Sequence, residues 1–360
     1  MITTPQYTSL YYGIIVFFFV ILNMCEAYKV TDFISRKRAE IMVAAFGIFN
    51  SFYWGLRPWN IGTDTGNYLR SFRVMERFTS FSQMIDNVDG DYFFRTLMYL
   101  FSRFGAYSMF LLSVSALTSM ALLYYTRLMS DKGRLFSPIL FMLYIVSVFS
   151  FPSMSCNIIR NGLAVSFLLV FSWYLLQGRW IQATCWAVLA LLGHHTTAIP
   201  ILFMVLIRCF ESVKLKWFYC LYGIVVVLSA LNFGVHRIGA LTELGIDKVN
   251  DYFLSDGFDY RVGFRADFVL FNTFFAVLFY WINSKTVVYE FYLKYYLLAS
   301  CLFFFWFHIP FSDRIGLYSW IAIPIVAFLG INERFPVKRQ MYSLLMFLMI
   351  FIINYALASR

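Results

Sequence analysis

The segment from Met154 to Pro200, MSCNIIRNGLAVSFLLVFSWYLLQGRWIQATCWAVLALLGHHTTAIP, predicts a pair of antiparallel membrane helices. Arg160 precedes the first apolar run, Gln177-Gly178-Arg179 interrupts it, and the second run ends at His194-His195. If both runs cross the bilayer, Arg160 and the two histidines lie at the same membrane face. Ionisable groups in a membrane are costly, about 2.5–3.5 kcal/mol for arginine at a helix centre, so they usually face protein or a water-filled cavity. We therefore expect a functional site at this end of the pair.

The composition is that of a polytopic membrane protein. Of the 360 residues, 61% are hydrophobic, 21% aromatic and 13% charged, whereas soluble domains have about 25% charged residues. The net charge of +10 is explained by lipid headgroups and cytoplasmic loops, so we expect no nucleic-acid partner. The first residues carry no basic segment and no small-residue cleavage site, which predicts a retained first span. The six cysteines contain no CxxC pair and predict no disulfide framework and no metal site.

Apolar runs separated by Gly, Pro and charged residues predict about twelve transmembrane helices, with ten or eleven as the alternative. The expected fold is all-α: a polytopic transmembrane helix bundle that forms one integral membrane domain over residues 1–360. Two outer loops, about 57–104 and 234–266, are long enough to hold short amphipathic helices. The predicted spans are residues 9–28, 41–56, 105–126, 138–152, 162–177, 180–194, 196–210, 217–233, 267–283, 295–309, 316–331 and 341–358.

Lysine and arginine are sorted between the two sides of this topology. One side holds 16 basic residues, among them eight of the nine lysines, and we assign it to the cytoplasm. The other side holds twelve arginines and one lysine. Topology needs only positive charge, whereas a guanidinium presents a planar fork that matches phosphate or carboxylate. We therefore expect a phosphate-bearing ligand at the outer face; the alternative is that these arginines pair with acids of the outer loops.

The first outer loop predicts an amphipathic helix with Arg70, Arg73 and Arg77 at helical spacing. Such a helix either lies along the membrane interface as an anchor, with its arginines on lipid headgroups, or presents them to a ligand. Asp64, just before it, either caps the helix or binds a sugar hydroxyl. A second amphipathic stretch is predicted from Asp91 to Phe104.

Further charged candidates occur in the second outer loop and in a later turn between spans. Arg261 and Arg265 are four residues apart and would share one face of a helix. The remaining candidates are Asp267 at the start of the next span and Asp313, Arg314 and Tyr318 at the later turn.

Five short motifs follow one another in an order that resembles the EpsG/Wzy-type polysaccharide polymerases. They are GTDTGNY at 62–68, IRNGLA at 159–164, HTTA at 195–198, GFRADF at 263–268 and RIGLY at 314–318. The resemblance covers most of the chain and implies a GT-C-like architecture. It implies a multi-pass glycosyltransferase of the bacterial cytoplasmic membrane that joins repeat units carried on undecaprenyl pyrophosphate at the outer face, without a nucleotide sugar or a metal cofactor. The partners implied are the lipid-linked oligosaccharide donor and acceptor, membrane lipids and a chain-length regulator protein.

The resemblance also gives roles to individual positions. Arg160, Arg265 and Arg314 are expected to bind pyrophosphate, because preorganised guanidinium groups stabilise a departing anion. His195 and Asp64 are the expected catalytic residues, with His195 as general base for the acceptor hydroxyl. The secondary candidates are Arg261, Asp267, Asp313, Arg57 and Tyr318, and the aspartates are rival bases. Two positions depart from the family pattern: Asn161 stands where Gln is usual, and Asp91 where Glu is frequent.

Other interpretations stay open at this point. Arg160 also fits a helix end, and His195 also fits an interfacial residue bonded to a carbonyl. The pair His194-His195 lacks a third ligand at helical spacing, so we expect no metal there. An O-antigen-ligase-like transferase and a lipid-linked oligosaccharide flippase or transporter are the alternative functions. Transporters tend to show acids deep in their spans and internal repeats, and this sequence shows neither clearly.

Overall fold

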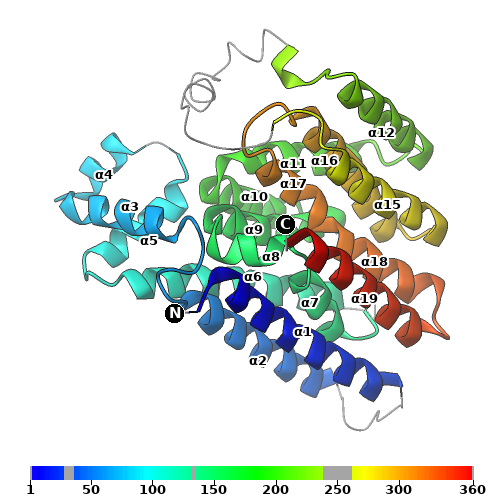
Figure 1. The fold of residues 1–360 in the computed structure, drawn as a ribbon, viewed down its shortest axis with the longest axis horizontal. Helices are drawn as coiled ribbons and strands as arrows, with labels where there is room; N and C mark the ends of the chain where they lie inside the picture. Colours follow the sequence, from blue (N-terminus) through cyan, green and yellow to red (C-terminus); the bar gives the residue numbers. More distant parts are fainter. Residues whose placement is uncertain (1, 28–35, 89, 131–134, 238–261, 359–360) are drawn as a thin grey trace. The chain divides into compact units, whose positions relative to one another are not determined.

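In the computed structural model every regular element among the described residues is a helix, which confirms the all-α prediction. The chain divides into two compact units, one of Met1–Ile201 with Phe335–Arg360 and the other of Leu202–Arg334. Figure 1 shows the order of the helices along the chain. The described residues are 2–27, 36–88, 90–130, 135–237 and 262–358.

The first unit holds both helices of the segment from Met154 to Pro200, together with the amphipathic helices of the first outer loop. Each predicted span in this unit coincides with one helix or with two helices in succession. Its helices are α1 (Thr4–Ala27), α2 (Arg36–Gly55), α3 (Thr65–Arg77), α4 (Phe81–Asn87), α5 (Tyr92–Ser102), α6 (Tyr107–Ser130), α7 (Pro138–Val146), α8 (Ser150–Cys156), α9 (Ile159–Leu176), α10 (Trp180–Gly193), the 3₁₀ turn η2 (His195–Thr197), α11 (Ala198–Cys209), whose last residues belong to the second unit, and α19 (Arg339–Ala358).

The second unit is built around a helix that packs against four others. Its elements are α12 (Leu215–Ala230), the 3₁₀ turn η3 (Val235–Arg237), α15 (Ala266–Ile282), α16 (Val287–Phe305), α17 (Asp313–Trp320) and α18 (Ala322–Arg334), and α16 contacts α12, α15, α17 and α18. Asn272 is fully buried in this unit. Hydroxyl groups of Ser300 and Ser319 donate to its side-chain oxygen at 3.3 and 3.4 Å, so the buried amide is satisfied by neighbouring helices.

Several of these helices have the length and composition of membrane spans. Among the described residues, five helices are long and apolar enough to cross a bilayer: α1, α6, α9, α16 and the continuous stretch Asp313–Arg334. The pair formed by α7 and α8 counts as a sixth if it is one span, and five further apolar helices are shorter. The chain is therefore a membrane protein, and the larger number of spans stays a prediction.

The predicted span at 138–152 corresponds to two helices in succession. Residues 138–146 and 150–156 form two helices, α7 and α8, that are bent by 76° at the link between them. Pro152 has no N–H to donate to the carbonyl of residue 148, and its ring would clash there in a continuous helix. The apolar run of this region therefore gives two short helices, and α8 leads directly into the start of α9.

Helix α9 lies at the centre of the first unit. Its side chains from Ile159 to Leu175 are buried on nearly every face, and it packs against α6, α8 and α10. The turn from α9 to α10 uses Gly178 at φ +67°, a conformation that suits glycine, and the Arg179 N–H donates back to the Tyr174 carbonyl at 2.9 Å. The hairpin predicted from the sequence is therefore present, and Arg160 stands in its first turn.

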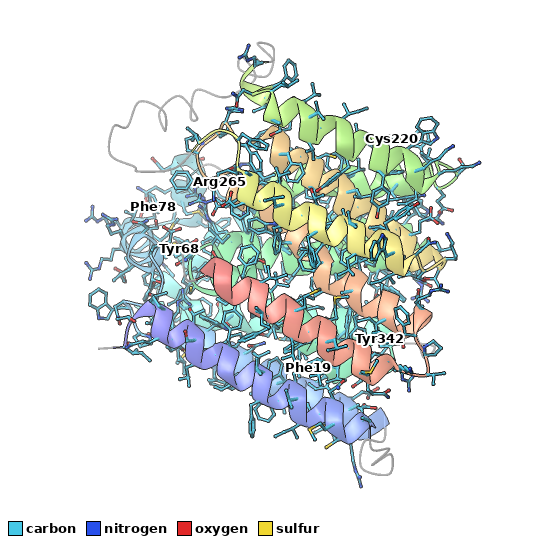
Figure 2. All side chains as sticks on the ribbon, turned by 45° about the vertical axis from the view of Figure 1, so that its right-hand side comes forward. Phe19, Tyr68, Phe78, Cys220, Arg265 and Tyr342 are labelled. Atoms are coloured by element: carbon cyan, nitrogen blue, oxygen red, sulfur yellow. The ribbon has the colours of Figure 1, made fainter. Side chains whose placement is uncertain are left out.

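The C-terminal helix α19 completes the first unit by packing along α1. The Phe19 and Phe347 rings stack in parallel with centroids 3.6 Å apart, and Figure 2 labels Phe19 on α1. The Asn23 side chain donates to the Gln340 carbonyl at 3.1 Å, close to the end of α1. The two ends of the chain thus build one core in this unit.

Candidate active site

One carboxylate draws together three segments of the first unit that are distant in sequence. Asp91, at the start of α5, accepts a hydrogen bond from Arg160 Nη1 of α9 on its Oδ2 atom at 2.7 Å. On Oδ1 it faces the Nδ1 atoms of His194 and His195 at 2.9 and 3.2 Å. We call Asp91, Arg160, His194 and His195 the Asp91 cluster. From the sequence we expect Arg160 and the histidines at one membrane face, and in the structure they lie around the same carboxylate.

Asp91 is held in an unusual backbone conformation. It caps the N-terminus of α5 with φ 50° and ψ 40°, the left-handed region, and follows Gly90 at φ +68°. Aspartate is among the few side chains that tolerate this region. Asp91 is only 4% exposed, so its carboxylate points into the protein and not toward water. A strained, buried acid at the start of a helix is the kind of feature that concentrates at functional sites.

The two histidines sit where α10 ends and the chain turns into α11. His194 is extended, at φ −161° and ψ 122°, and its N–H closes the last turn of α10 on the Ala190 carbonyl at 2.9 Å. The hydroxyl of Thr197 donates to the His194 carbonyl at 2.8 Å and holds the 3₁₀ turn in place. The side chain of His194 is 11% exposed and that of His195 is 72% exposed. His194 therefore belongs to the protein interior, and His195 presents its ring to the outside.

The charges of the cluster follow from these contacts. Burial alone raises the pKa of Asp91, but the hydrogen bonds from His194 and His195 and the charges of His194 and Arg160 outweigh it and hold that pKa well below its ordinary range. Burial also lowers the pKa of His194, the Asp91 carboxylate raises it, and the net shift is downward. The ionised carboxylate accepts only, so each imidazole that bonds to it carries its proton on Nδ1. In the neutral form of either ring the Nε2 atom then holds the lone pair.

Arg160 connects the cluster to the GTDTGNY motif. Its guanidinium also hydrogen-bonds to the Tyr68 hydroxyl, which itself donates to the Asn157 carbonyl at 2.8 Å. The Nε atom of Arg160 is buried and has no hydrogen-bond partner within the described residues. About a third of the side chain, 33%, is exposed. Arg160 therefore has a fixed position and keeps donor capacity beyond its bond to Asp91.

The GTDTGNY motif folds against the link between α8 and α9. Gly62 lies at φ +91°, where a Cβ atom would come within 2.8 Å of the Asn157 side-chain oxygen. That oxygen accepts a hydrogen bond from the Thr63 N–H at 2.7 Å. The motif thus positions Tyr68 and, through it, Arg160. Its glycine is required by backbone conformation and by close packing.

Asp64 occupies the N-cap position of α3, but its side chain makes no capping hydrogen bond. Its Oδ1 atom instead accepts from the Asn67 side chain at 3.2 Å. The structure therefore does not support the capping interpretation, and Asp64 stays a predicted catalytic residue. The arginines of α3, Arg70, Arg73 and Arg77, are exposed, while Tyr68 and Phe72 on the opposite face are buried.

Arg57 is 5% exposed and lies next to the link between α8 and α9. It donates through Nη1 to the Trp54 carbonyl at 2.6 Å and through Nη2 to the Cys156 carbonyl at 3.2 Å. Burial lowers the pKa of this guanidinium. These contacts fasten the end of α2 to the end of α8, which is a structural role beside the secondary ligand role predicted for it.

The other predicted residues belong to the second unit. Arg265 forms two bonds to the Asp267 carboxylate, at 3.1 and 2.9 Å, and its guanidinium lies 4.4 Å from the centroid of the Phe268 ring. Figure 2 shows Arg265 at the start of α15. Arg265 and Asp267 therefore form an ion pair. This agrees with the alternative that arginines of the outer face pair with acids of the outer loops.

The turn before α17 holds the last group of candidates. Arg314 lies over the Phe311 ring, 4.7 Å from its centroid, and Asp313 is the first residue of α17. Both have intermediate exposure, whereas Tyr318 is fully buried. Arg261 lies outside the described residues.

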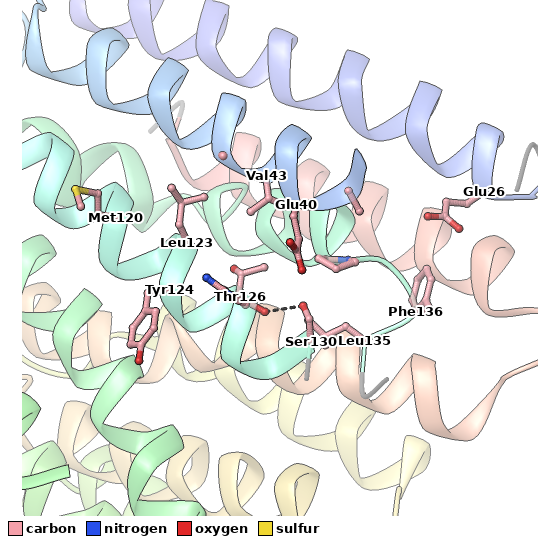
Figure 3. A pocket seen from close by; sticks show the side chains of 14 residues that line it. Glu26, Glu40, Val43, Met120, Leu123, Tyr124, Thr126, Ser130, Leu135 and Phe136 are labelled. Atoms are coloured by element: carbon pink, nitrogen blue, oxygen red, sulfur yellow. Dashed lines mark hydrogen bonds between the residues drawn. The ribbon is translucent and has the colours of Figure 1, made fainter. Parts of the chain in front are cut away.

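A cavity of about 600 Å³ lies elsewhere in the first unit, between α1, α2, α6 and the start of α7. Figure 3 shows its lining, which includes Glu26, Glu40, Leu123 and Tyr124. Arg127 also lines it. Most of the remaining lining is apolar, and the cavity shares no residue with the Asp91 cluster. The cluster, with its convergent charged and titratable groups, is therefore the stronger site candidate.

The fold and the cluster define a class: a multi-helix membrane protein with an arginine, a buried acid and an exposed histidine gathered at helix ends. The chain belongs to the EpsG family, which matches residues 40–360. Membership makes it a membrane protein of the polysaccharide-polymerase type, with a glycosyltransferase-like role in polysaccharide biosynthesis. Searches among curated proteins and among solved structures found no match.

Asp91 is the residue that sequence reasoning undervalued. In the sequence it begins an amphipathic stretch and departs from the family pattern, and neither feature indicates a role for it. Its sequence context, Gly90 followed by an acid at the start of an amphipathic stretch, is a signal for a tight turn into a helix. Nothing in that context indicates contacts with Arg160 and His194, which are 69 and 103 residues away.

Proposed function

We propose that the protein joins oligosaccharide repeat units carried on undecaprenyl pyrophosphate, at the outer face of the bacterial cytoplasmic membrane. The observation that supports this most is the Asp91 cluster, in a chain that belongs to the EpsG family. It combines an anchored guanidinium for an anion with an exposed imidazole whose tautomer is set by a carboxylate. Those are the two functions that glycosyl transfer from a lipid pyrophosphate requires.

In the proposed reaction His195 is the general base. Its Nδ1–H donates to Asp91, so the lone pair lies on Nε2, and the ring is 72% exposed and open to a sugar hydroxyl. As the acceptor oxygen bonds to the anomeric carbon of the donor, its proton passes to Nε2. Asp91 stabilises the imidazolium that forms, as the aspartate does in Ser-His-Asp enzymes.

Arg160 is proposed to bind the pyrophosphate. As the bond between the anomeric carbon and the phosphate oxygen breaks, undecaprenyl pyrophosphate departs with the bonding electrons. A preorganised donor directed at such developing charge is worth about 10²–10³ in rate. Arg265 and Arg314 are proposed as further pyrophosphate ligands, and Asp64 as a second catalytic group. The reaction proposed here uses no metal, and a chain-length regulator protein is a proposed partner.

Complementation of a deletion strain tests this proposal. Arg160→Ala and His195→Ala are expected to give glycans capped with a single repeat unit, while the protein level in the membrane is unchanged. Arg73→Ala is the matched control, because Arg73 is exposed on α3 outside the cluster. Long-chain glycan in the Arg160→Ala strain would contradict the site.

The glycan phenotype of the deletion strain separates the alternatives. Polymerase loss leaves lipid-linked single repeat units in the outer leaflet. Their absence from the outer leaflet would indicate a flippase. Accumulated long chains that stay on the lipid would indicate a ligase-like transferase.

A further inference from the structure

Three potential metal ligands meet in the Asp91 cluster. The Asp91 Oδ1 atom lies 2.9 Å from His194 Nδ1 and 3.2 Å from His195 Nδ1. All three residues offer ligand atoms within 4.8 Å of one another. In a tetrahedral zinc site with bonds of about 2.0–2.1 Å, neighbouring ligand atoms are roughly 3.3 Å apart. The two distances from Oδ1 to the imidazole nitrogens, 2.9 and 3.2 Å, are therefore close to those around a shared zinc ion.

Oδ1 is also crowded as a hydrogen-bond acceptor. Besides the two ring nitrogens, it faces the backbone N–H of His195 at 3.3 Å. Three donors thus converge on an oxygen that has two lone pairs. Arg160 occupies the other carboxylate oxygen and does not relieve this crowding. A cation between Oδ1 and the two Nδ1 atoms would replace both ring N–H contacts and leave the backbone bond in place.

We infer that Asp91, His194 and His195 form a site for one divalent transition-metal ion of the zinc type. Two imidazoles and one carboxylate suit Zn²⁺, Co²⁺ or Ni²⁺, whereas Mg²⁺ and Ca²⁺ prefer oxygen ligands. Three protein ligands leave one coordination position for water. Residue spacing in the sequence does not predict this site, because Asp91 lies at the start of α5 and not on the helix that precedes the histidines.

Access and charge set the character of the site. The ring of His195 is 72% exposed, so an ion can enter from solvent, and the 3% exposed side chain of Asp91 forms the floor. The Arg160 guanidinium on Oδ2 repels a cation on Oδ1. The site is therefore one that fills and empties with the metal concentration, and not a permanent structural site.

A bound metal ion would prevent His195 from acting as the general base. This consequence rests on the proposed function. Metal bound to Nδ1 of His195 displaces the proton from that atom, and a neutral ring then carries its proton on Nε2. Nε2 can no longer accept the proton of the acceptor hydroxyl. Bound Zn²⁺ is thus a reversible inhibitor of polymerisation, with the ring proton moved from one nitrogen to the other.

Direct binding tests the site without any substrate. The protein is purified in detergent with a tag that contains no histidine, and Zn²⁺ is titrated by calorimetry and Co²⁺ by visible absorption. We expect one ion per chain, bound more tightly than about 100 µM. Asp91→Asn, His194→Gln and His195→Gln are each expected to weaken binding by about tenfold to a hundredfold or more. The control is His308→Gln, which changes a histidine outside the cluster.

The Arg160→Gln variant is expected to change the Zn²⁺ affinity in the opposite direction. Removing the adjacent positive charge is expected to tighten Zn²⁺ binding by roughly tenfold, since one unit charge at a few ångströms is worth at least about 1.4 kcal/mol toward a divalent ion. Unchanged Zn²⁺ affinity in the three ligand variants, or preference for Mg²⁺, would overturn the site. Zn²⁺ binding without inhibition of polymerisation supports the site and contradicts the proposed role of His195. Loss of activity on chelation supports the site, and it contradicts both the metal-free reaction and the inhibitory role of the ion.

Discussion

Replacing Asp91 with asparagine is expected to slow polymerisation by about 10²–10⁴-fold. The carboxylate accepts from Arg160 at 2.7 Å on one oxygen and faces His195 Nδ1 at 3.2 Å on the other. Asparagine keeps one acceptor oxygen and puts an NH₂ group where a donor already points. Either the guanidinium or the imidazole then loses its acceptor, and no negative charge remains for the imidazolium. The same substitution in Ser-His-Asp enzymes costs about 10⁴ in kcat, because the histidine takes the wrong tautomer.

The cost of this substitution in folding stability should be much smaller than its cost in rate. Removing one partner of a buried ion pair typically costs about 3–5 kcal/mol. The Arg160 side chain is 33% exposed, so water screens part of the loss. We therefore expect a destabilisation of about 1–3 kcal/mol, seen as a lower thermal midpoint in detergent with a normal protein level in the membrane.

The assay is the initial rate of repeat-unit joining in proteoliposomes supplied with lipid-linked repeat units. Asp86→Asn, an exposed acid on α4, is the matched control and should keep the full rate. Because Asp91 is proposed to act through His195, the double variant Asp91→Asn/His195→Gln should be within about threefold of the slower single variant. Losses that multiply in the double variant, or a normal rate for Asp91→Asn, would refute the reasoning.

Three further outcomes follow from the same geometry. Arg160→Lys keeps the charge but cannot hold a carboxylate and a phosphate together, so the joining rate should fall by about tenfold or more; a full rate would show that the fork is not needed. Tyr68→Phe removes the hydroxyl that positions Arg160 and should lower the same rate by about tenfold, roughly the worth of one hydrogen bond to a charged group; an unchanged rate would contradict that positioning role. Gly162→Ala would bring a methyl group into the Met154 carbonyl and should destabilise the protein by about 1–3 kcal/mol. The measurement is the thermal midpoint, compared with that of Gly223→Ala, whose added methyl group meets no atom within 4 Å. Equal midpoints would contradict this packing.

The helices of the fold could be predicted because their signal is local. Apolar runs of sufficient length identify spans without knowledge of their neighbours, and a helix is present at each of them. The bend between α7 and α8 was not predicted. Pro152 lies near the end of an otherwise uniform apolar run, and the composition of the run dominated the prediction. A prediction of spans from hydropathy alone therefore does not detect a bend that one proline causes.

The candidate site could be predicted only in part, because its central contacts are not local. Arg160 and His195 stood out as ionisable residues at the ends of apolar runs. Asp91 did not, since its partners come from helices that follow it by 69 to 104 residues. Arg57 makes contacts that its residue type does not predict: its Nη1 and Nη2 atoms donate to the carbonyls of Trp54 and Cys156, beside the ligand role predicted for it. The type of a residue predicts which contacts its side chain can make. Only the packing of the folded protein decides which of these contacts form.

The way α19 packs on α1 has a consequence for the order of assembly during synthesis. The first unit is discontinuous, made of residues 1–201 and 335–360, while residues 202–334 form a continuous unit. The ribosome must therefore finish the second unit before Phe347 can stack on Phe19 and before the Ser343 carbonyl can accept the Tyr144 hydroxyl at 2.5 Å. The unit that carries the Asp91 cluster begins first and closes last, so a stop codon before α19 would leave an unfinished core for membrane quality control to recognise.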